Sequence, residues 1–118
     1  MISIDELYWE EKVFFAGCLK GIILIDGVVD DEEIAGVDAI RDEDRFDDLD
    51  EALEAFEEEM RQSEAEDFLW RKAAGVTRPE ARELILSRLR YIALRDGYAK
   101  DAEVHFLGKL REIWGLEV

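Results

Sequence analysis

The sequence predicts an all-α fold, a bundle of about six helices that includes two pseudo-symmetric helical hairpins. Three observations lead to this prediction. The 118 residues include one proline, a residue that interrupts helices. No segment alternates β-branched and polar residues in the manner of a strand. Apolar residues instead recur at intervals of three and four, and at 48% hydrophobic they suffice for the core of one domain, residues 1–118.

Two helices are expected before residue 43. Ser3 and Glu6 have the spacing of a capping box, which predicts a first helix from Ser3 onward. Gly27 is placed to end that helix, and a second one is expected from Asp31. The buried face predicted for the first helix is Phe14, Phe15, Cys18, Leu19, Ile22 and Ile23. The inward residues of the second are Ile34, Val37 and Ile40.

The negative charge of the chain lies in one internal third. Residues 30–67 hold 19 acids and 3 bases, so they alone account for the net charge of −16, and the remaining residues balance. Apolar residues inside this third still keep a helical spacing. The pattern therefore predicts an acidic amphipathic helix, inserted at residues 43–67, and not a disordered tail. Its expected inward residues are Phe46, Leu49, Leu53, Phe56 and Met60.

Three further helices complete the prediction. A short one is expected around residues 68–70 and ends near Gly75. Thr77 is the expected N-cap of the next helix, with Glu80 reaching back to it. A last helix is expected from Asp101 to about Trp114. The buried stripe predicted for the helix after Thr77 is Leu84, Ile85, Leu89, Ile92 and Ala93. The inward residues of the last helix are Val104, Leu107 and Leu110.

Residues 14–40 and 84–110 are interpreted as an internal repeat. A shift of 70 residues aligns them without a gap. Seven positions are identical: Leu19/Leu89, Ile22/Ile92, Leu24/Leu94, Asp26/Asp96, Gly27/Gly97, Asp31/Asp101 and Glu33/Glu103. Apolar matches arise between any two amphipathic helices, but the four other matches fall within eight residues. They favour a duplicated hairpin.

Each copy carries the element Asp-Gly-x-x-x-Asp-x-Glu between its two helices, and two interpretations of it remain open. In the first, glycine ends one helix while the later acids cap and complement the start of the next. In the second, the acids gather around a hard divalent cation such as calcium, magnesium or manganese, which prefers carboxylate oxygens. The candidate ligands are Asp26, Asp31, Glu33, Asp96, Asp101 and Glu103.

A normal EF-hand is excluded. Placing Gly27 at the sixth position of that loop puts Ile22 and Leu24 at its first and third ligand positions, where neither side chain carries oxygen. The second copy fails in the same way at Ile92 and Leu94.

The paired Asp-Gly elements resemble the tellurite-resistance protein B (TerB-like) family, whose motif has the form Ala-Asp-Gly-x-Ile-x-x-x-Glu. Residues 25–33 match it at the Asp, Gly, branched apolar and Glu positions, and residues 95–103 match more loosely, with Ala99 at the larger aliphatic position. The resemblance implies an all-helical domain without established catalytic activity, in bacterial stress response or tellurite resistance. It also implies cation binding through acids, or an adaptor role in membrane-associated protein complexes.

The charge limits the partners. Phosphate binding requires Lys and Arg, so nucleic acid is disfavoured, and so is docking on anionic lipid through a basic patch. A basic protein surface or a cation fits instead. The N-terminus lacks the basic start of a signal peptide and no apolar run is long enough for a membrane span, so we expect a cytoplasmic protein without direct membrane insertion. Salt adaptation is an alternative source of the acidity, but it would spread acids over all helices.

Other chemistry-bearing residues favour structural roles. His105 is the single histidine and aligns with Ala35, which indicates a partly exposed helix surface. Cys18 lies on the apolar face of its helix and is expected to be a core residue. No nucleophile motif or phosphate-binding glycine loop is present, so no enzyme is expected. A small anion site is one interpretation of the arginines at 88, 90 and 95, and the simpler one is that they pair with the acidic third.

Overall fold

In the computed structural model, six α-helices surround one another without a strand among the described residues, which are 2–24, 31–63, 67–94 and 101–116. The all-α prediction is confirmed. The helices are α1 (Trp9–Leu24), α2 (Asp31–Asp42), α3 (Leu49–Gln62), α4 (Phe68–Ala74), α5 (Pro79–Ala93) and α6 (Asp101–Ile113), preceded by a short 3-10 helix at Ile4–Glu6. None of them combines the length and the apolar character that a bilayer crossing needs.

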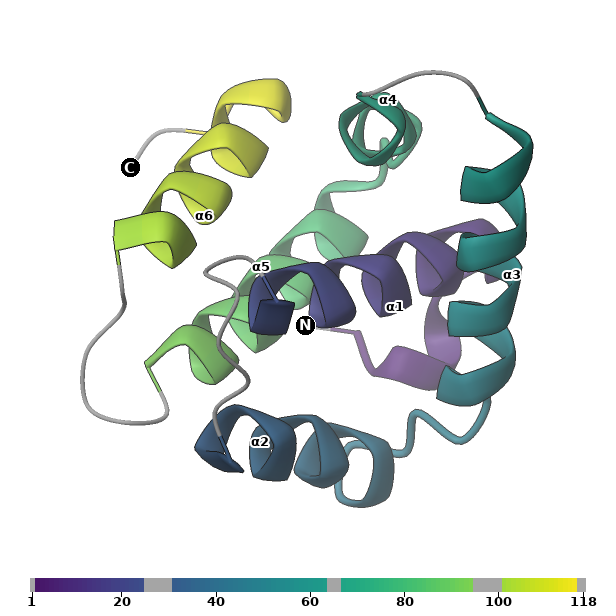
Figure 1. Ribbon diagram of the computed structural model, residues 1–118, viewed down its shortest axis with the longest axis vertical. Coiled ribbons are helices and arrows are strands. Elements are labelled where there is room, and N and C mark those ends of the chain that lie inside the picture. Colours follow the sequence, from purple (N-terminus) through teal and green to yellow (C-terminus); the bar gives the residue numbers. More distant parts are fainter. Residues whose placement is uncertain (1, 25–30, 64–66, 95–100, 117–118) are drawn as a thin grey trace.

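Helix α1 is the centre of the bundle. In Figure 1 it runs through the middle, with α3 along one side, α4 above it and α5 behind it. The residues predicted to be buried on this helix are buried, apart from Ile23, whose side chain is not described. Burial is not confined to one face, however, because every residue from Val13 to Leu19 is buried. Residues 13–19 are apolar on every side of the helix, as expected for a segment enclosed by others, and α3, α4 and α5 all pack against α1.

The two helical hairpins begin at matched positions. Helices α1 and α5 start 70 residues apart, at Trp9 and Pro79, and α2 and α6 start at Asp31 and Asp101. Burial also follows this offset, with both members of each of these pairs buried: Phe14/Leu84, Phe15/Ile85, Leu19/Leu89, Ile22/Ile92 and Ile40/Leu110. The hairpins share a core but are covered by different neighbours, since α2 packs on α5 while α6 packs on α4 and α5.

Several predicted ends and caps were wrong. The first helix begins at Trp9 and not at Ser3, because residues 4–6 form a separate 3-10 turn. Helix α5 is preceded by Arg78, not Thr77, and has no side-chain cap. Phe46 is fully buried but lies in the turn before α3, after Arg45 with a positive φ of 59°. The expected stop at Gly27 lies outside the described residues.

Three residues expected to face inward are exposed. Ile34 and Val104 occupy the first turns of α2 and α6 and are 40% and 52% exposed, while Met60 near the end of α3 is 46% exposed. All three lie near helix ends. The stripe predicted for α5 is buried as expected, and α4 ends at Ala74, next to Gly75, as expected.

Candidate functional site

Acidic side chains of α3 and of the turn before it form ion pairs with α1, α2 and α4. Lys12 donates to Asp48 at 3.1 Å, and Arg41 donates to Asp50 at 2.9 Å. Further pairs join Lys20 to Glu57 and Lys72 to Glu59. The hydrogen bond from Lys20 lowers the pKa of the Glu57 carboxyl. This part of the acidic third therefore forms ion pairs within the chain.

The apolar face of α3 packs against a glycine of α1. Gly17 on α1 lies against the ring of Phe56, where a Cβ atom at position 17 would overlap the ring. Phe56 is 6% exposed and also packs against Phe68, with ring centroids 5.3 Å apart. Absence of a side chain at Gly17 thus lets α3 approach α1 closely. Ion pairs then flank this contact on the polar side.

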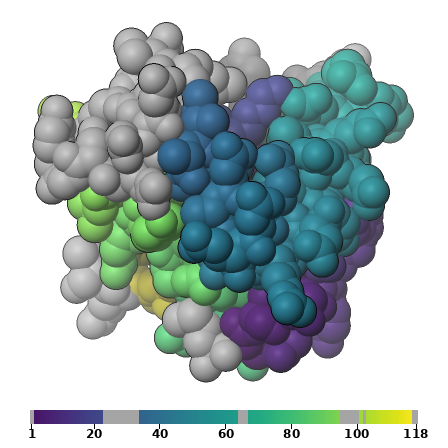
Figure 2. Space-filling model, turned by 90° about the horizontal axis from the view of Figure 1, so that it is seen from below, coloured from purple at the N-terminus to yellow at the C-terminus, as the bar shows by residue number. Residues whose placement is uncertain are grey.

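A second set of acids forms no ion pair with any residue that the structure describes. It comprises Asp42, Glu43, Asp47, Glu51 and Glu54, all exposed. They follow the end of α2 and the outer side of α3, two elements tied together by Arg41 and Asp50. Figure 2 shows the outer surface of α2 continuing into the segment that leads to α3. We call these five residues the acidic face.

The six candidate cation ligands are described unevenly. Asp26 and Asp96 lie outside the described residues, and the side chains of Asp31 and Glu33 at the start of α2 are likewise not described. The first and third residues of α6 can be compared: Asp101 is exposed, whereas Glu103 is 1% exposed. A buried carboxylate in a first turn is favoured by the helix dipole. The side chains of Asp101 and Glu103 therefore lie in different environments.

No group of three His, Cys, Asp or Glu side chains within residues 2–24, 31–63, 67–94 and 101–116 lies close enough to hold a metal ion. Two of the six ligands proposed from the Asp-Gly elements, Asp26 and Asp96, fall outside those ranges, and the side chains of Asp31 and Glu33 are not described. The cation site therefore stays a prediction.

Comparison with known proteins identifies the family of the chain. The sequence model of the family described as tellurite resistance protein TerB matches residues 13–118, from the buried part of α1 to the C-terminal residue. The chain belongs to the TerB family. No curated protein and no solved structure matches it significantly. The resemblance stated from the two Asp-Gly elements is confirmed by this match.

Sequence reasoning missed an ion pair that joins the starts of the two hairpins in this TerB domain. Glu11 on α1 is 5% exposed and accepts a hydrogen bond from the Tyr8 amide at 2.7 Å. The Arg78 guanidinium donates to both oxygens of the same carboxylate, at 3.0 and 2.6 Å, and lies 3.8 Å from the Tyr8 ring centroid. Burial acts to raise the pKa of Glu11, but the bonds from Arg78 and Tyr8 lower it. A 67-residue separation hides such a pair from local patterns.

The expected pairing of arginines with the acidic third holds at Arg88, which lies 2.9 Å from Asp44. Arg95 lies outside the described residues, and Arg90 forms no ion pair with a described residue. Cys18 is completely buried, and burial raises the pKa of its thiol. The core role predicted for Cys18 is confirmed.

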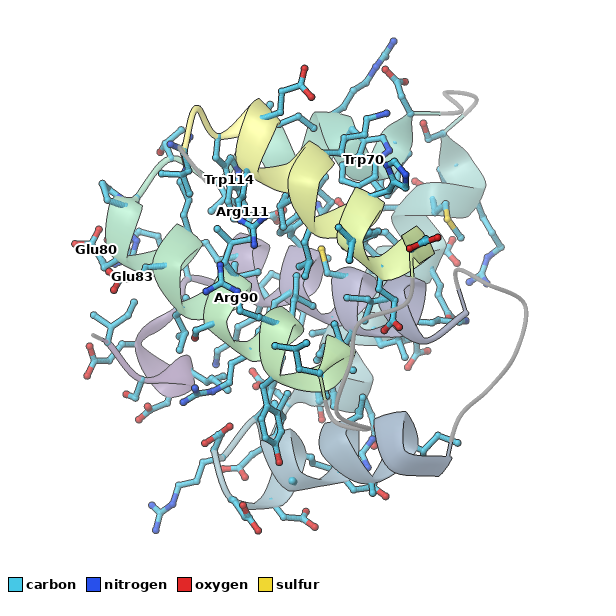
Figure 3. The ribbon with its side chains drawn as sticks, turned by 90° about the vertical axis from the view of Figure 1, so that its left-hand side faces the viewer. Trp70, Glu80, Glu83, Arg90, Arg111 and Trp114 are labelled. Carbon is cyan, nitrogen blue, oxygen red and sulfur yellow. The ribbon has the colours of Figure 1, made fainter. Side chains whose placement is uncertain are left out.

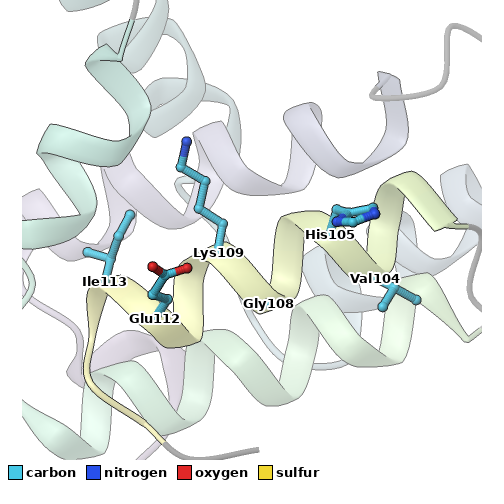
Figure 4. Close-up of a pocket in the computed structure, with 6 residues that line it drawn as sticks. All are labelled: Val104, His105, Gly108, Lys109, Glu112 and Ile113. Atoms are coloured by element: carbon cyan, nitrogen blue, oxygen red, sulfur yellow. The ribbon is translucent and has the colours of Figure 1, made fainter.

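His105 is exposed, as predicted, and lies along a hollow of about 930 Å³ on the surface of α6. Figure 4 shows its lining residues, all from α6, with His105, Lys109 and Glu112 as the polar groups. The Lys109 ammonium lies 4.9 Å from the centroid of the Trp70 ring. The TerB domain thus presents this histidine on a helix surface open to solvent.

Proposed function

We propose that this TerB-family chain is a non-enzymatic binding domain whose acidic face, Asp42, Glu43, Asp47, Glu51 and Glu54, binds a basic surface of a partner protein. One observation supports it most. These five acids are exposed and form no ion pair with a described residue, whereas neighbouring acids such as Asp50 and Glu57 form ion pairs with α1 and α2. Like charges placed side by side repel, and a cationic partner would relieve that repulsion.

The biological setting follows from the family. We propose a role in tellurite or metal resistance or a related bacterial stress response, in the cytoplasm, as an adaptor that joins a basic or membrane-associated protein complex. The acidic face would supply fast, salt-sensitive association, because complementary charge mainly raises association rates.

A lysine-rich helical peptide of defined sequence serves as probe. We expect the triple variant Asp47→Asn, Glu51→Gln, Glu54→Gln to bind it at least about fivefold more weakly than the wild type, with the loss reduced in high salt. The charge-matched control is Glu80→Gln, Glu83→Gln, Glu112→Gln, three exposed acids on α5 and α6. Fluorescence anisotropy measures both. An equal loss in the two variants means that net charge alone attracts the probe, and the proposal is then wrong.

A second candidate function is divalent-cation binding by the paired Asp-Gly elements. It is supported by the recurrence of three acids in each copy, Asp26, Asp31 and Glu33 and their equivalents, and by the preference of hard cations for carboxylates. Calorimetric titration with calcium, magnesium and manganese is the measurement. Binding that persists unchanged in Asp26→Asn with Asp96→Asn would contradict it.

We also propose that residues 1–118 form one domain built from a duplicated hairpin, 14–40 and 84–110, with the acidic helix inserted at 43–67. The common offset of the helix starts and of the buried positions supports this.

A further inference from the structure

The seat of α3 on the first hairpin has an equivalent on the second hairpin. Five residues of α1 and α2 form that seat: Lys12, Ala16, Gly17, Lys20 and Arg41. Moving each by 70 positions gives Arg82, Leu86, Ser87, Arg90 and Arg111. All five of these line a single groove of about 640 Å³ between α5 and α6. The repeat thus places basic side chains at three equivalent positions around both surfaces.

The groove has basic residues at the positions equivalent to the basic residues of the seat. Arg90 on α5 and Arg111 on α6 correspond to Lys20 and Arg41, the residues that bind Glu57 and Asp50 of α3. Figure 3 shows the two arginines next to each other between the helices, with Glu80 and Glu83 toward the start of α5. Neither arginine forms an ion pair with a residue in the described ranges. Lys20 and Arg41 are thus paired with acids of α3, whereas their counterparts Arg90 and Arg111 line the groove without such a partner among the described residues.

The groove also has an apolar part. Leu86 lines it, and Leu116 at its border is 39% exposed. An adjoining hollow of about 170 Å³ shares Arg90 and Arg111 and adds Leu94 and Val104, which are 47% and 52% exposed. Exposed apolar side chains gathered beside unpaired cations are typical of a binding surface.

We propose that this groove binds an acidic amphipathic helix of a partner protein, in the way that α3 binds the first hairpin. The α3 contacts define the chemistry required. Asp50 and Glu57 are seven residues apart, hence two turns apart on one helix face, and Leu53 and Phe56 lie between them toward the bundle. The partner helix carries two carboxylates at this spacing, with apolar residues three and six positions after the first.

Two substitutions within the repeat make the groove shallower than the seat. Leu86 replaces Ala16, and Ser87 replaces Gly17, the residue whose missing side chain admits the Phe56 ring. A ring at the equivalent position meets a Cβ atom. The partner helix therefore carries a smaller apolar residue there, such as Leu. The α3 helix of a second copy does not meet this requirement, and its apolar face is already covered by α1.

A peptide with the sequence of α3 and its flanks, altered at one position, provides the test. The probe is residues 43–62 with Phe56→Leu, labelled and titrated with the full chain by fluorescence anisotropy. We expect Arg90→Gln with Arg111→Gln to weaken binding about tenfold or more. The matched control changes the equivalent residues of the seat, Lys20→Gln with Arg41→Gln, and is expected to leave binding within about twofold. Circular dichroism verifies that both variants remain helical.

Each other outcome overturns the proposal. No binding by the wild type removes the site, and equal losses in both variants indicate attraction by charge alone. If only the variant with Lys20→Gln and Arg41→Gln loses binding, the peptide displaces α3 from its own seat.

The unaltered peptide with Phe56 adds a second test, because it is expected to bind the groove more weakly than the peptide with Phe56→Leu. A chain that is dimeric in sedimentation and becomes monomeric on Arg90→Gln with Arg111→Gln has a second copy as its occupant.

Discussion

Helices α1 and α5 begin at equivalent positions and bury equivalent residues, yet their outer faces differ. The α1 face carries α3 through an apolar contact at Gly17 and flanking ion pairs with acids. The α5 face borders an open groove with Arg90 and Arg111. The α1 face has the small residues Ala16 and Gly17, which allow a helix to pack closely. The α5 face has the larger Leu86 and Ser87 at the equivalent positions, which make its groove shallower. Packing distance depends on a few side-chain volumes more than on overall pattern.

Among the tests of this difference between the α1 and α5 faces, the largest effect is expected from removing the Phe56 ring, which packs α3 against α1. Phe56→Ala is expected to cost about 3–5 kcal/mol in the free energy of unfolding, because the ring is buried between Gly17 and Phe68 and leaves a cavity. Urea denaturation measures it. Met60→Ala on the same helix is the control and is expected to cost under about 0.5 kcal/mol, since Met60 is exposed. Similar losses in the two variants would show that α3 is not held by this contact.

The close approach itself is tested at Gly17. Gly17→Ala is expected to destabilise the chain by about 1–3 kcal/mol, because the new methyl group overlaps the Phe56 ring and α3 must shift. Gly108→Ala on α6 meets no atom within 4 Å and is expected to stabilise by about 0.5–1 kcal/mol through helix propensity. Thermal unfolding of the two variants should move in opposite directions. A stabilising Gly17→Ala would contradict the close seat.

The ion pair between the hairpins has a pH signature. Because the folded pKa of Glu11 is below its ordinary value of 4.5, the bond to Arg78 stabilises the fold above about pH 4.5 and is lost as pH falls through the folded pKa. Glu11→Gln is expected to cost about 1–2 kcal/mol at pH 7. The difference from wild type should shrink in urea titrations below about pH 4. A difference independent of pH would mean that the carboxylate charge contributes nothing.

The smallest effect compares equivalent cations. Lys20→Gln removes the exposed pair with Glu57 and is expected to lower the unfolding midpoint by about 1–2 °C in low salt, with less effect in high salt. Arg90→Gln is expected to leave the midpoint unchanged, since Arg90 has no ion-pair partner among the described residues. Scanning calorimetry at two salt concentrations checks both. If Arg90→Gln lowered the unfolding midpoint more than Lys20→Gln, the conclusion that Lys20 is paired in the fold and Arg90 is not would be contradicted.

Much of the fold was predictable from the sequence because its signals are local. The apolar spacing of Leu84, Ile85 and Leu89 marks the buried stripe of α5, and the chemistry of Gly75 marks the end of α4. Exposure at Ile34 was not predictable in the same way. Whether an apolar residue near a helix end is covered depends on how far a neighbouring helix extends, and periodicity does not contain that length.

The candidate site was predictable only in part. The acidic third and its helical spacing were visible in the sequence, but Glu51 and Glu57 look alike there. Only the structure separates them, since Glu57 pairs with Lys20, 37 residues away along the chain, and Glu51 faces solvent. The acidic face is therefore narrower than the acidic segment.

The sequence by itself determined the all-α class, the TerB resemblance and the 70-residue offset between the helix starts of the two hairpins, because helical period, turn residues and motif spacing are properties of the chain. Tertiary structure decided which surface each hairpin covers and which charges remain available. Those outcomes depend on contacts between residues far apart in sequence, such as Gly17 with Phe56 and Arg78 with Glu11. Such contacts depend on how much space two side chains leave for each other and on where each side chain points in the folded chain. The spacing of residues along the sequence specifies neither.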